Sequence, residues 1–178
     1  MTKVQYYVAS SVDGFIATVD DRLDWLLQFG FDDFGAMYDA FLADIGSLVM
    51  GSTTYEWLLR EVGDDWPYPS LPCFVATNRA LASHPAGDIA FVQGDIAAIY
   101  QRAVAAADAR NVWVVGGGDV AAQFANEGLL DDLILTIMPV VLGAGRPLLP
   151  LAQPTGKLSV RDVRSFASGA MTATYSLH

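Results

Sequence analysis

The sequence is poor in cysteine, histidine and positive charge. Its single cysteine, Cys73, excludes disulfide bonds within the chain and zinc sites built from several cysteines. The only histidines are His84 and His178, and neither has a second histidine or a carboxylate at the spacing of metal ligands. We therefore expect no metal site.

Long apolar runs are also missing. The longest, Leu133–Leu142, is interrupted by Thr136 and Pro139, and it falls short of the about 20 residues that span a bilayer. The first residues lead directly into a strand-like segment, and Asp13 lies where a signal peptide would need apolar residues. These features predict a cytoplasmic protein.

Positive charge is scarce because ten basic residues face twenty acidic ones, which gives a net charge of −10. A nucleic-acid-binding surface would need a basic stripe, so this class of function is excluded. The same negative field repels anionic small molecules. Any phosphate must therefore be held by backbone N–H groups, hydroxyl groups and one or two placed arginines.

Apolar residues are abundant: 53% of the 178 residues are hydrophobic, enough for one core in a single domain spanning residues 1–178. Short runs rich in Val, Ile, Phe and Tyr predict strands, most of them bounded by Gly, Pro, Asn or Asp. The predicted strands are Val4–Ala9, Ser47–Met50, Cys73–Thr77, Ile89–Gln93, Val112–Val115, Leu133–Leu142, Leu158–Phe166 and Ala170–Leu177.

Helical segments alternate with these strands through the first two-thirds of the chain. Such alternation predicts an α/β fold with a mostly parallel sheet flanked by helices, and the last two strands read as a C-terminal antiparallel hairpin. Thr53 and Glu56 form an expected capping box, and Asp95 is an expected N-cap. The predicted helices are Asp33–Asp44, Thr54–Glu61, Ile96–Ala109 and Val120–Glu127.

Two glycine turns follow predicted strands and precede predicted helices. In the first, Gly116, Gly117 and Gly118 stand before Asp119 and Val120, and in the second Gly51 stands before three hydroxyl residues. Glycine allows close approach of the backbone to a ligand, and a helix N-terminus offers free N–H groups to a pyrophosphate. A simpler alternative exists for each segment: the three glycines could form only a tight turn, and Thr53 could serve only to cap the helix after Gly51. The hydroxyl residues are Ser52, Thr53 and Thr54.

A third strand ends in Thr77, Asn78 and Arg79. An arginine can hold a phosphate through two parallel hydrogen bonds, although an arginine at a strand end is often only a solvated charge. Together, the three strand ends predict a nucleotide site more strongly than each does alone.

The set of motifs resembles the dihydrofolate reductase-like superfamily, in particular its riboflavin-biosynthesis reductase branch. The resemblance covers nearly the whole chain, and its strength lies in the order and spacing of the pieces. These are Ala9–Ala17, Leu23–Leu26, Met50–Glu56, Val115–Gly118, Leu130–Leu133 and Pro139–Leu148.

The resemblance implies NADPH as the cofactor. The segment Gly51–Thr54 and the glycines Gly116–Gly118, with Asp119 and Val120 behind them, would contact its phosphates. Thr77, Asn78 and Arg79 would contact the 2′-phosphate of the adenosine ribose. Ala9 and Ile16 would line the nicotinamide side.

The resemblance also implies an acid near the substrate ring, because hydride transfer leaves negative charge that a proton must quench. Counting back from Met50–Gly51 places Asp33 at that position with Asp32 beside it, and Asp13 is an alternative. All three have plainer interpretations: Asp32 and Asp33 suit the first turn of a helix, and Asp13 suits a turn. Trp25 is expected as a stacking wall or as a core residue.

Together these expectations predict an NADPH-dependent reductase of the 5-amino-6-(5-phosphoribosylamino)uracil reductase type. Its substrate would be a pyrimidine- or pteridine-like heterocycle. Dihydrofolate reductase activity is one alternative. A non-catalytic nucleotide-binding module is another, since Val115 replaces a glutamate found in many relatives and Asp119 puts negative charge at a helix start. We also expect a homodimer, paired through Leu133–Leu142 and the loop to Pro147.

Overall fold

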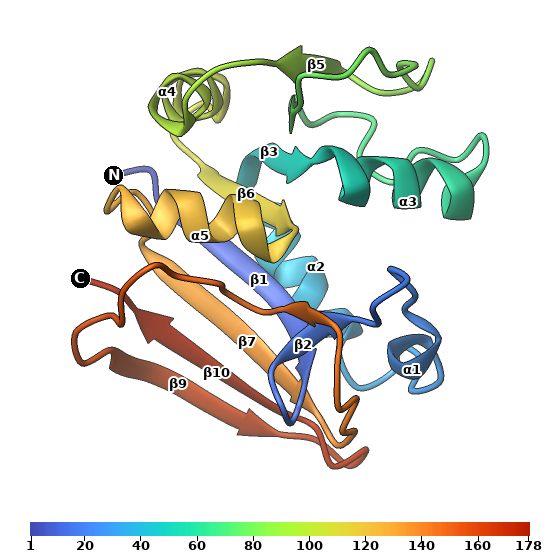
Figure 1. Ribbon diagram of the computed structural model, residues 1–178, viewed down its shortest axis with the longest axis vertical. Helices are drawn as coiled ribbons and strands as arrows, with labels where there is room; N and C mark the ends of the chain where they lie inside the picture. The colour runs from blue at the N-terminus through green and yellow to red at the C-terminus, as the bar shows by residue number, and fades with distance from the viewer.

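Strands from the whole length of the chain form one eight-stranded sheet in the computed structural model, which describes all 178 residues (Figure 1). The strand order is β5-β4-β3-β6-β1-β7-β10-β9, and β1 and β3 to β7 pair in parallel. The strands are β1 (Val4–Ser11), β3 (Ile45–Gly51), β4 (Cys73–Ala76), β5 (Ile89–Val92), β6 (Asn111–Gly116), β7 (Asp132–Met138), β9 (Ser159–Ser165) and β10 (Met171–Ser176).

Helices cover both faces of this sheet, as its mostly buried parallel strands require. On one face, α4 and α5 pack on β1, β3 and β6 through Ile99, Ala103 and Phe124. On the other, α2 and α3 pack through Tyr55, Leu58 and the aromatic residues of α2. The helices are α1 (Asp24–Leu27), α2 (Gly35–Ala43), α3 (Ser52–Val62), α4 (Ile96–Ala106) and α5 (Gly118–Asn126).

The predicted fold class is confirmed, including the antiparallel hairpin of β9 and β10 at the end of the chain. The largest difference in a strand is at β7, which ends at Met138 because Pro139 cannot continue the ladder. β7 also lies between β1 and β10, so both of its edges are already paired. A second copy therefore cannot extend the sheet at this strand, and the expected dimer stays a prediction.

Residues 139–150, called here the crossing loop, pass over the carboxyl end of β1 toward α5. Asp13 accepts hydrogen bonds from the amides of Leu142 (3.0 Å) and Gly143 (2.7 Å) in this loop. Within it, β8 (Arg146–Pro147) pairs with β2 (Phe15–Ala17) in a second, two-stranded sheet. The crossing loop is thus fixed to the segment that follows β1.

Of the two helix caps expected from the sequence, one is confirmed and one is wrong. The side chain of Asp95 does cap α4, accepting from the amide of Ala98 at 2.8 Å. The expected capping box at α3 is wrong, because the helix begins at Ser52 and its N-cap is Gly51, without a side-chain cap. None of the five helices has the length and apolar character that crossing a membrane requires.

Candidate functional site

The two glycine turns lie against each other. They end the neighbouring parallel strands β3 and β6, where Met50 is paired with Gly116. A Cβ atom placed on Gly51 would lie 3.1 Å from Cγ2 of Val120, and one on Gly116 would lie 3.3 Å from Oγ1 of Thr54. Each turn therefore contacts the helix that follows the other, and a side chain at either glycine would crowd this contact.

Both helices begin at this junction without a side-chain cap. The N-caps are Gly51 for α3 and Gly117 for α5, and neither helix start is satisfied by a side-chain hydrogen bond. The first-turn N–H groups of a helix have no partner within it, and they carry partial positive charge. Two such helix starts next to each other form a concentrated set of donors for an anionic ligand.

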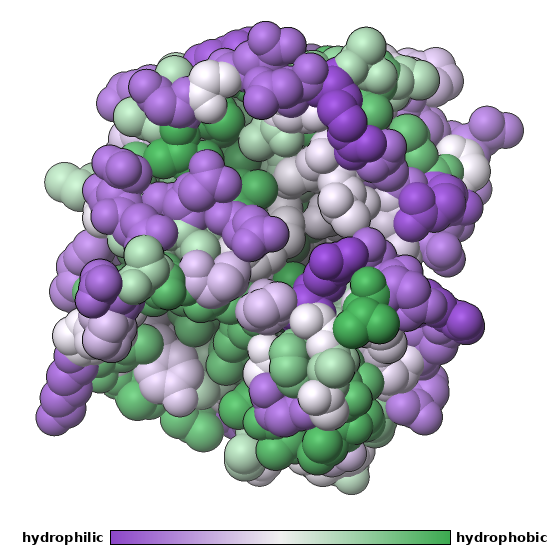
Figure 2. Space-filling model, viewed as in Figure 1, coloured by the Kyte–Doolittle hydropathy of each residue, from purple (hydrophilic) through white to green (hydrophobic).

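A cleft of about 620 Å³ opens at this junction. It appears as a hollow near the middle of the face in Figure 2, below α3 in the view of Figure 1. Eleven of the sequence-predicted residues line it: Ala9, Ile16, Gly51, Ser52, Thr53, Thr54, Gly116, Gly117, Gly118, Asp119 and Val120. The structure thus brings together the two glycine turns and the expected nicotinamide side.

Four aromatic side chains form much of the remaining wall: Tyr7 on β1, Trp57 on α3, Tyr68 in the loop after α3, and Trp113 on β6. Trp113 is held edge-on by Tyr68 (5.7 Å between ring centroids) and by Phe41 (5.3 Å). Its indole N–H donates to the backbone carbonyl of Tyr7 at 3.2 Å. The ring of Trp113 is therefore fixed before any ligand binds.

Tyr7 packs on α2, against Phe41 at 4.7 Å between ring centroids. Burial, with a smaller contribution from Tyr38, raises the pKa of Tyr7 to about 12. The hydroxyl group therefore stays protonated through the neutral range, and it can act only as a hydrogen-bond donor or acceptor there.

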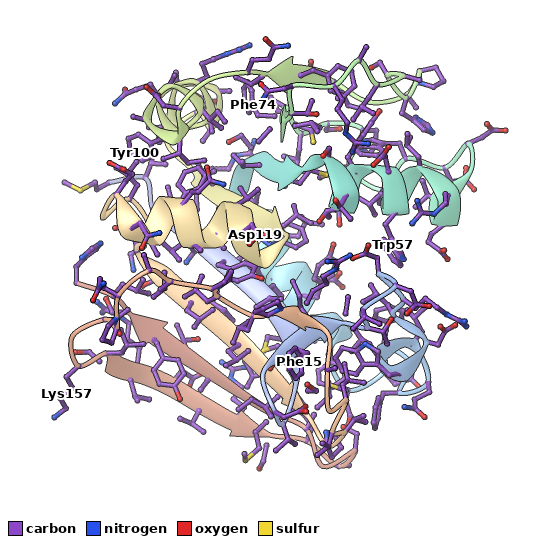
Figure 3. The ribbon with its side chains drawn as sticks, in the orientation of Figure 1. Phe15, Trp57, Phe74, Tyr100, Asp119 and Lys157 are labelled. Carbon is purple, nitrogen blue, oxygen red and sulfur yellow. The ribbon has the colours of Figure 1, made fainter.

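An ion pair closes one side of the cleft. Arg146, in β8, donates to both carboxylate oxygens of Asp21, with Nε at 2.7 Å and an Nη nitrogen at 3.0 Å. The hydrogen bonds and charge of Asp21 raise the pKa of Arg146, and the charge of Asp119 adds to this shift. In Figure 3, Asp119 lies at the start of α5 and Trp57 projects from α3.

The third predicted strand end lies beside the cleft and not in its wall. Ala76 lines the cleft, but Thr77, Asn78 and Arg79 do not. The guanidinium of Arg79 donates to both oxygens of Glu56 on α3, at 3.1 and 2.6 Å. Arg79 is thus held at the outer side of α3, with its charge already paired.

The predicted acids lie elsewhere. Asp33 is in the turn before α2, exposed, and accepts a hydrogen bond from the backbone amide of Ser168 at 3.0 Å. Asp32 beside it is also exposed. Because α2 begins only at Gly35, counting back along the chain placed both residues too near the cleft, and that expected position is corrected.

Asp13 and Trp25 are also outside the cleft wall. Three hydrogen bonds, from the Ser11 hydroxyl and then from two crossing-loop amides, lower the pKa of Asp13 to about 2. Its carboxylate is therefore a structural acceptor in this position. Trp25 packs in a small core with Met138 and Ala170, which is the plainer of its two expected roles.

Several cleft residues gave no usable signal in the sequence. Asp21 and Arg146 are 125 positions apart, and only the pairing of β2 with β8 brings them together. Trp57 lies in a predicted helix, and its position in the apolar pattern is typical of any helix face. Trp113 had the only local clue, since it lies three residues before Gly116 on the strand that leads to the glycine turn.

Known proteins share this architecture over the whole chain. A crystal structure from Shewanella sp. PV-4, named for riboflavin biosynthesis, superposes with a TM-score of 0.81 at 28% identity, covering 99% of this chain and 98% of that one. The Bacillus subtilis (strain 168) protein YwjB is 31% identical over 165 residues, 92% of each chain. Enterococcus faecalis dihydrofolate reductase, complexed with NADP(H), superposes with a TM-score of 0.62 at 15% identity, covering 98% of this chain and 95% of that one.

A longer relative is similar over only part of its length. The Thermotoga maritima deaminase and 5-amino-6-(5-phosphoribosylamino)uracil reductase superposes with a TM-score of 0.65 at 17% identity, and the match covers 98% of this chain but 56% of that one. Residues 2–173 match the RibD C-terminal domain family. With its mixed sheet, paired glycine turns and aromatic cleft, this chain belongs to the RibD C-terminal domain family.

Proposed function

We propose that this protein is an NADPH-dependent reductase that transfers a hydride to a small pyrimidine- or pteridine-like ring. The observation that carries the proposal is the meeting of two uncapped helix starts, at Gly51 and Gly117, in one cleft with an aromatic wall. The first feature suits the phosphates of a dinucleotide, and the second suits two flat rings placed face to face.

The residues at the helix starts fit the cofactor's pyrophosphate. Ser52, Thr53 and Thr54 add hydroxyl donors to the free amides of α3, and the amides of Gly118 and Asp119 face the same junction at α5. These groups are backbone or neutral donors, so they bind phosphate in an acidic molecule without adding positive charge. When bound, NADPH supplies the hydride.

We further propose that Arg79, with Thr77 and Asn78, binds the 2′-phosphate that distinguishes NADPH from NADH. The three residues follow Ala76, which lines the cleft beside α3. In this role Arg79 exchanges its pairing with Glu56 for the phosphate. That exchange weakens the preference for NADPH, because the existing ion pair must be given up.

The hydroxyl group of Tyr7 is the proposed donor to the substrate. Hydride transfer to a C=N or C=O group leaves negative charge on the acceptor, and a fixed donor in a dry site stabilises such charge. Tyr7 lines the cleft, and its ring is immobilised by Phe41 and Trp113. Asp33 and Asp13, the acids expected from the sequence, are bound to backbone amides outside the cleft wall.

The test has two stages. Titration of the protein with NADPH and with NADH, followed by tryptophan fluorescence, reports cofactor binding because Trp57 and Trp113 line the cleft. Oxidation of NADPH is then followed by absorbance with a panel of dihydrofolate, pterins, aminouracils and small carbonyl compounds. We expect tight NADPH binding and turnover with at least one ring compound; failure of the protein to bind either nucleotide would refute the proposal.

A non-catalytic nucleotide-binding module is the second candidate, and one observation favours it. Asp119 puts a carboxylate in the first turn of α5, where a reductase would have to accommodate the cofactor's phosphates. This alternative predicts nucleotide binding without turnover of any ring compound. Turnover that is strongly reduced in Tyr7→Phe while NADPH still binds would exclude it.

We also propose that the protein is a homodimer paired through β9. All seven residues of this outermost strand are exposed, and the β9–β10 hairpin presents Val160, Val163 and Met171 to solvent. An edge strand has unpaired backbone groups that a second chain can extend, and two-fold pairing of the same strand is self-complementary. A second copy of this chain is therefore the occupant that fits this edge.

A further inference from the structure

A proline-rich loop between α3 and β4 brings one aromatic side chain into the cleft wall. Its central residues are Trp66, Pro67, Tyr68 and Pro69; both aromatic residues are buried and both prolines are exposed. A proline has a fixed φ angle and restricts the backbone of the residue before it, so Tyr68 has little backbone freedom between Pro67 and Pro69. Tyr68 lines the cleft, whereas Trp66 does not. The loop therefore holds the Tyr68 side chain at a defined place in the wall.

The ring of Tyr68 is also fixed by two tryptophans. Its centroid lies 6.0 Å from that of Trp66 and 5.7 Å from that of Trp113, and both contacts are edge-on. Trp113 is three residues before Gly116 on β6, which corresponds to about 10 Å along a strand. Its side chain packs in the core under α2 and α3, whereas α5 packs on the other face of the sheet. Tyr68 thus belongs to a part of the wall that is separate from the start of α5.

The hydroxyl group of Tyr68 has one partner within the protein. It accepts a hydrogen bond from the hydroxyl group of Tyr38, on α2, at 3.4 Å. A phenol that accepts such a bond keeps its own hydrogen for another partner. Burial, with a smaller contribution from Tyr38, raises the pKa of Tyr68 well above its usual range. The Tyr68 hydroxyl is therefore a neutral donor at the cleft.

Tyr38 reaches the cleft through its neighbours, because it is not itself part of the wall. Its ring packs on Tyr7 at 6.3 Å and on Trp113 at 6.0 Å between centroids, while its hydroxyl group contacts that of Tyr68. The N–H group of Trp113 is already bound to the carbonyl of Tyr7. The hydroxyl groups of Tyr7 and Tyr68 are thus the polar groups that these three wall residues can offer a ligand.

We propose that Tyr68 is a substrate-binding residue, whose hydroxyl group donates to an acceptor atom of the substrate ring such as a carbonyl oxygen, and that Tyr38 positions this hydroxyl group. The inference rests on the proposed reductase function and deepens it. Stacking on an aromatic wall leaves a flat ring free to rotate in its own plane, whereas a few placed polar groups fix its orientation. Tyr7 stabilises charge that develops during hydride transfer, and Tyr68 holds the ring before and during that step.

The test measures ring binding by calorimetry in the full-length protein saturated with NADP⁺. The probes are lumazine and 5,6-diaminouracil, which are planar rings with carbonyl oxygens. Tyr68→Phe should weaken their binding about fivefold to tenfold, the usual effect of losing one neutral hydrogen bond. Tyr38→Phe should weaken it less, because the Tyr68 hydroxyl remains but is no longer oriented. The double variant should bind like Tyr68→Phe alone, since residues that act through one another do not have additive effects.

Tyr55→Phe is the matched control. The Tyr55 hydroxyl donates to the carbonyl of Ala82 at 2.7 Å, and its ring packs on Trp66 in the same core, but Tyr55 is outside the cleft wall. This variant should lower the melting temperature and leave ring binding unchanged. Equal weakening in Tyr55→Phe and Tyr68→Phe would mean that looser packing causes the loss, and it would overturn the inference. Additive losses in the Tyr38 and Tyr68 double variant would overturn the positioning role.

Turnover provides a second readout. With a ring compound that the enzyme reduces, Tyr68→Phe should raise KM and leave kcat nearly unchanged, because a bond made equally before and during the reaction does not alter the barrier from the bound state. A lower kcat at constant KM would contradict this assignment. A protein that binds NADP⁺ but neither probe overturns the inference alone. A protein that binds no nicotinamide nucleotide contradicts the proposed function itself.

Discussion

One ion pair joins the end of β4 to the first turns of α3. Arg79 and Glu56 make two hydrogen bonds, and their side chains are 54% and 34% exposed, so the pair is accessible to solvent and can exchange partners. An exposed pair of this kind contributes little to stability, about 1 kcal/mol or less. In the proposed function the pair affects ligand selection, because it determines whether the Arg79 guanidinium is free to bind the 2′-phosphate.

Glu56→Gln should therefore raise the preference for NADPH over NADH about tenfold, since Arg79 then loses its competing carboxylate. Arg79→Ala should bring the ratio of the dissociation constants for NADH and NADPH close to one. The measurement is the ratio of the two dissociation constants by fluorescence titration. Glu61→Gln removes the same charge from the exposed end of α3 and serves as the control; an unchanged ratio in Glu56→Gln would contradict the role of the pair.

Tyr7 is the second residue whose role can be isolated. Tyr7→Phe should lower kcat roughly 100-fold with a small change in KM, because it removes one donor to the developing charge and keeps the ring packing. The wild-type rate should not depend on Tyr7 ionisation between pH 6 and 9, because this whole range lies at least about three pH units below the Tyr7 pKa of about 12. Tyr100→Phe, on α4, is the control, and equal losses in both variants would exclude a specific role.

At the scale of elements, the crossing loop links the segment after β1 to the start of α5. Gly118 allows this contact, because a Cβ atom there would overlap the carbonyl oxygens of Pro147 and Leu148. The hydroxyl group of Tyr6 also donates to the carbonyl of Leu148 at 3.2 Å. The loop that carries Arg146 is thus packed directly on a helix start of the proposed cofactor site.

Gly118→Ala should lower the free energy of unfolding by about 1–3 kcal/mol, the usual cost of forcing extra volume into a packed contact. Gly35→Ala is the matched control, because its Cβ atom would meet no neighbour and it is the first residue of α2. That change should be neutral or stabilising by up to about 1 kcal/mol. Urea denaturation gives both values, and equal effects of the two changes would show that the crossing loop can move away.

Asp13 holds the same loop at its other end, and its effect on stability depends on pH. Its pKa is lowered from 3.8 to about 2 by the Ser11 hydroxyl and the amides of Leu142 and Gly143. A lowered carboxylate pKa contributes stability that is fully present above about pH 4 and is lost as the pH falls through about 2. The difference in melting temperature between wild type and Asp13→Asn should therefore be constant near neutrality and shrink between pH 4 and pH 2.

The control for this titration is Asp20→Asn. Asp20 accepts a hydrogen bond only from Thr18, two residues away, so it ties no distant segments together. It should change the melting temperature less than Asp13→Asn at neutral pH. A larger effect at Asp20 would mean that the anchoring of the crossing loop is not what stabilises the fold.

The elements themselves were largely predictable from the sequence. Apolar runs bounded by turn residues gave every strand of the main sheet, and the backbone part of the site followed, because glycine turns at the carboxyl ends of neighbouring parallel strands must lie together. The side-chain part was not predictable. Asp21 and Arg146 meet through β2 and β8, strands too short for a periodic signal, and Asp33 turned out to pair with the amide of Ser168.

At the scale of the whole molecule, the sheet has two unlike edges. β5 forms one edge, and β9, exposed on both of its faces, forms the other. The proposed dimer uses the second edge, and it leaves the cleft free because no residue of β9 or β10 belongs to the cleft wall.

Val163→Asp should convert the proposed dimer into a monomer, because it introduces a charge into the apolar part of the interface. The mass in solution, from light scattering coupled to size-exclusion chromatography, is the measurement. Val19→Asp is the matched control, since Val19 is exposed to a similar extent (64% against 62%) but lies in the loop before α1. A monomeric wild type would refute pairing through β9.

Both chain ends lie on the side of the sheet where β1, β6 and β7 begin, and the cleft lies where the parallel strands end (Figure 1). Lys3 and Val4 are tied there to Asn111 and Asp131, and Leu177 donates to the carbonyl of Asp131. A tag or a surface linker attached at either end would therefore point away from the opening. Protein molecules immobilised through either end would therefore expose the cleft opening to the surrounding solution. This arrangement makes the chain well suited to sensor-based binding measurements.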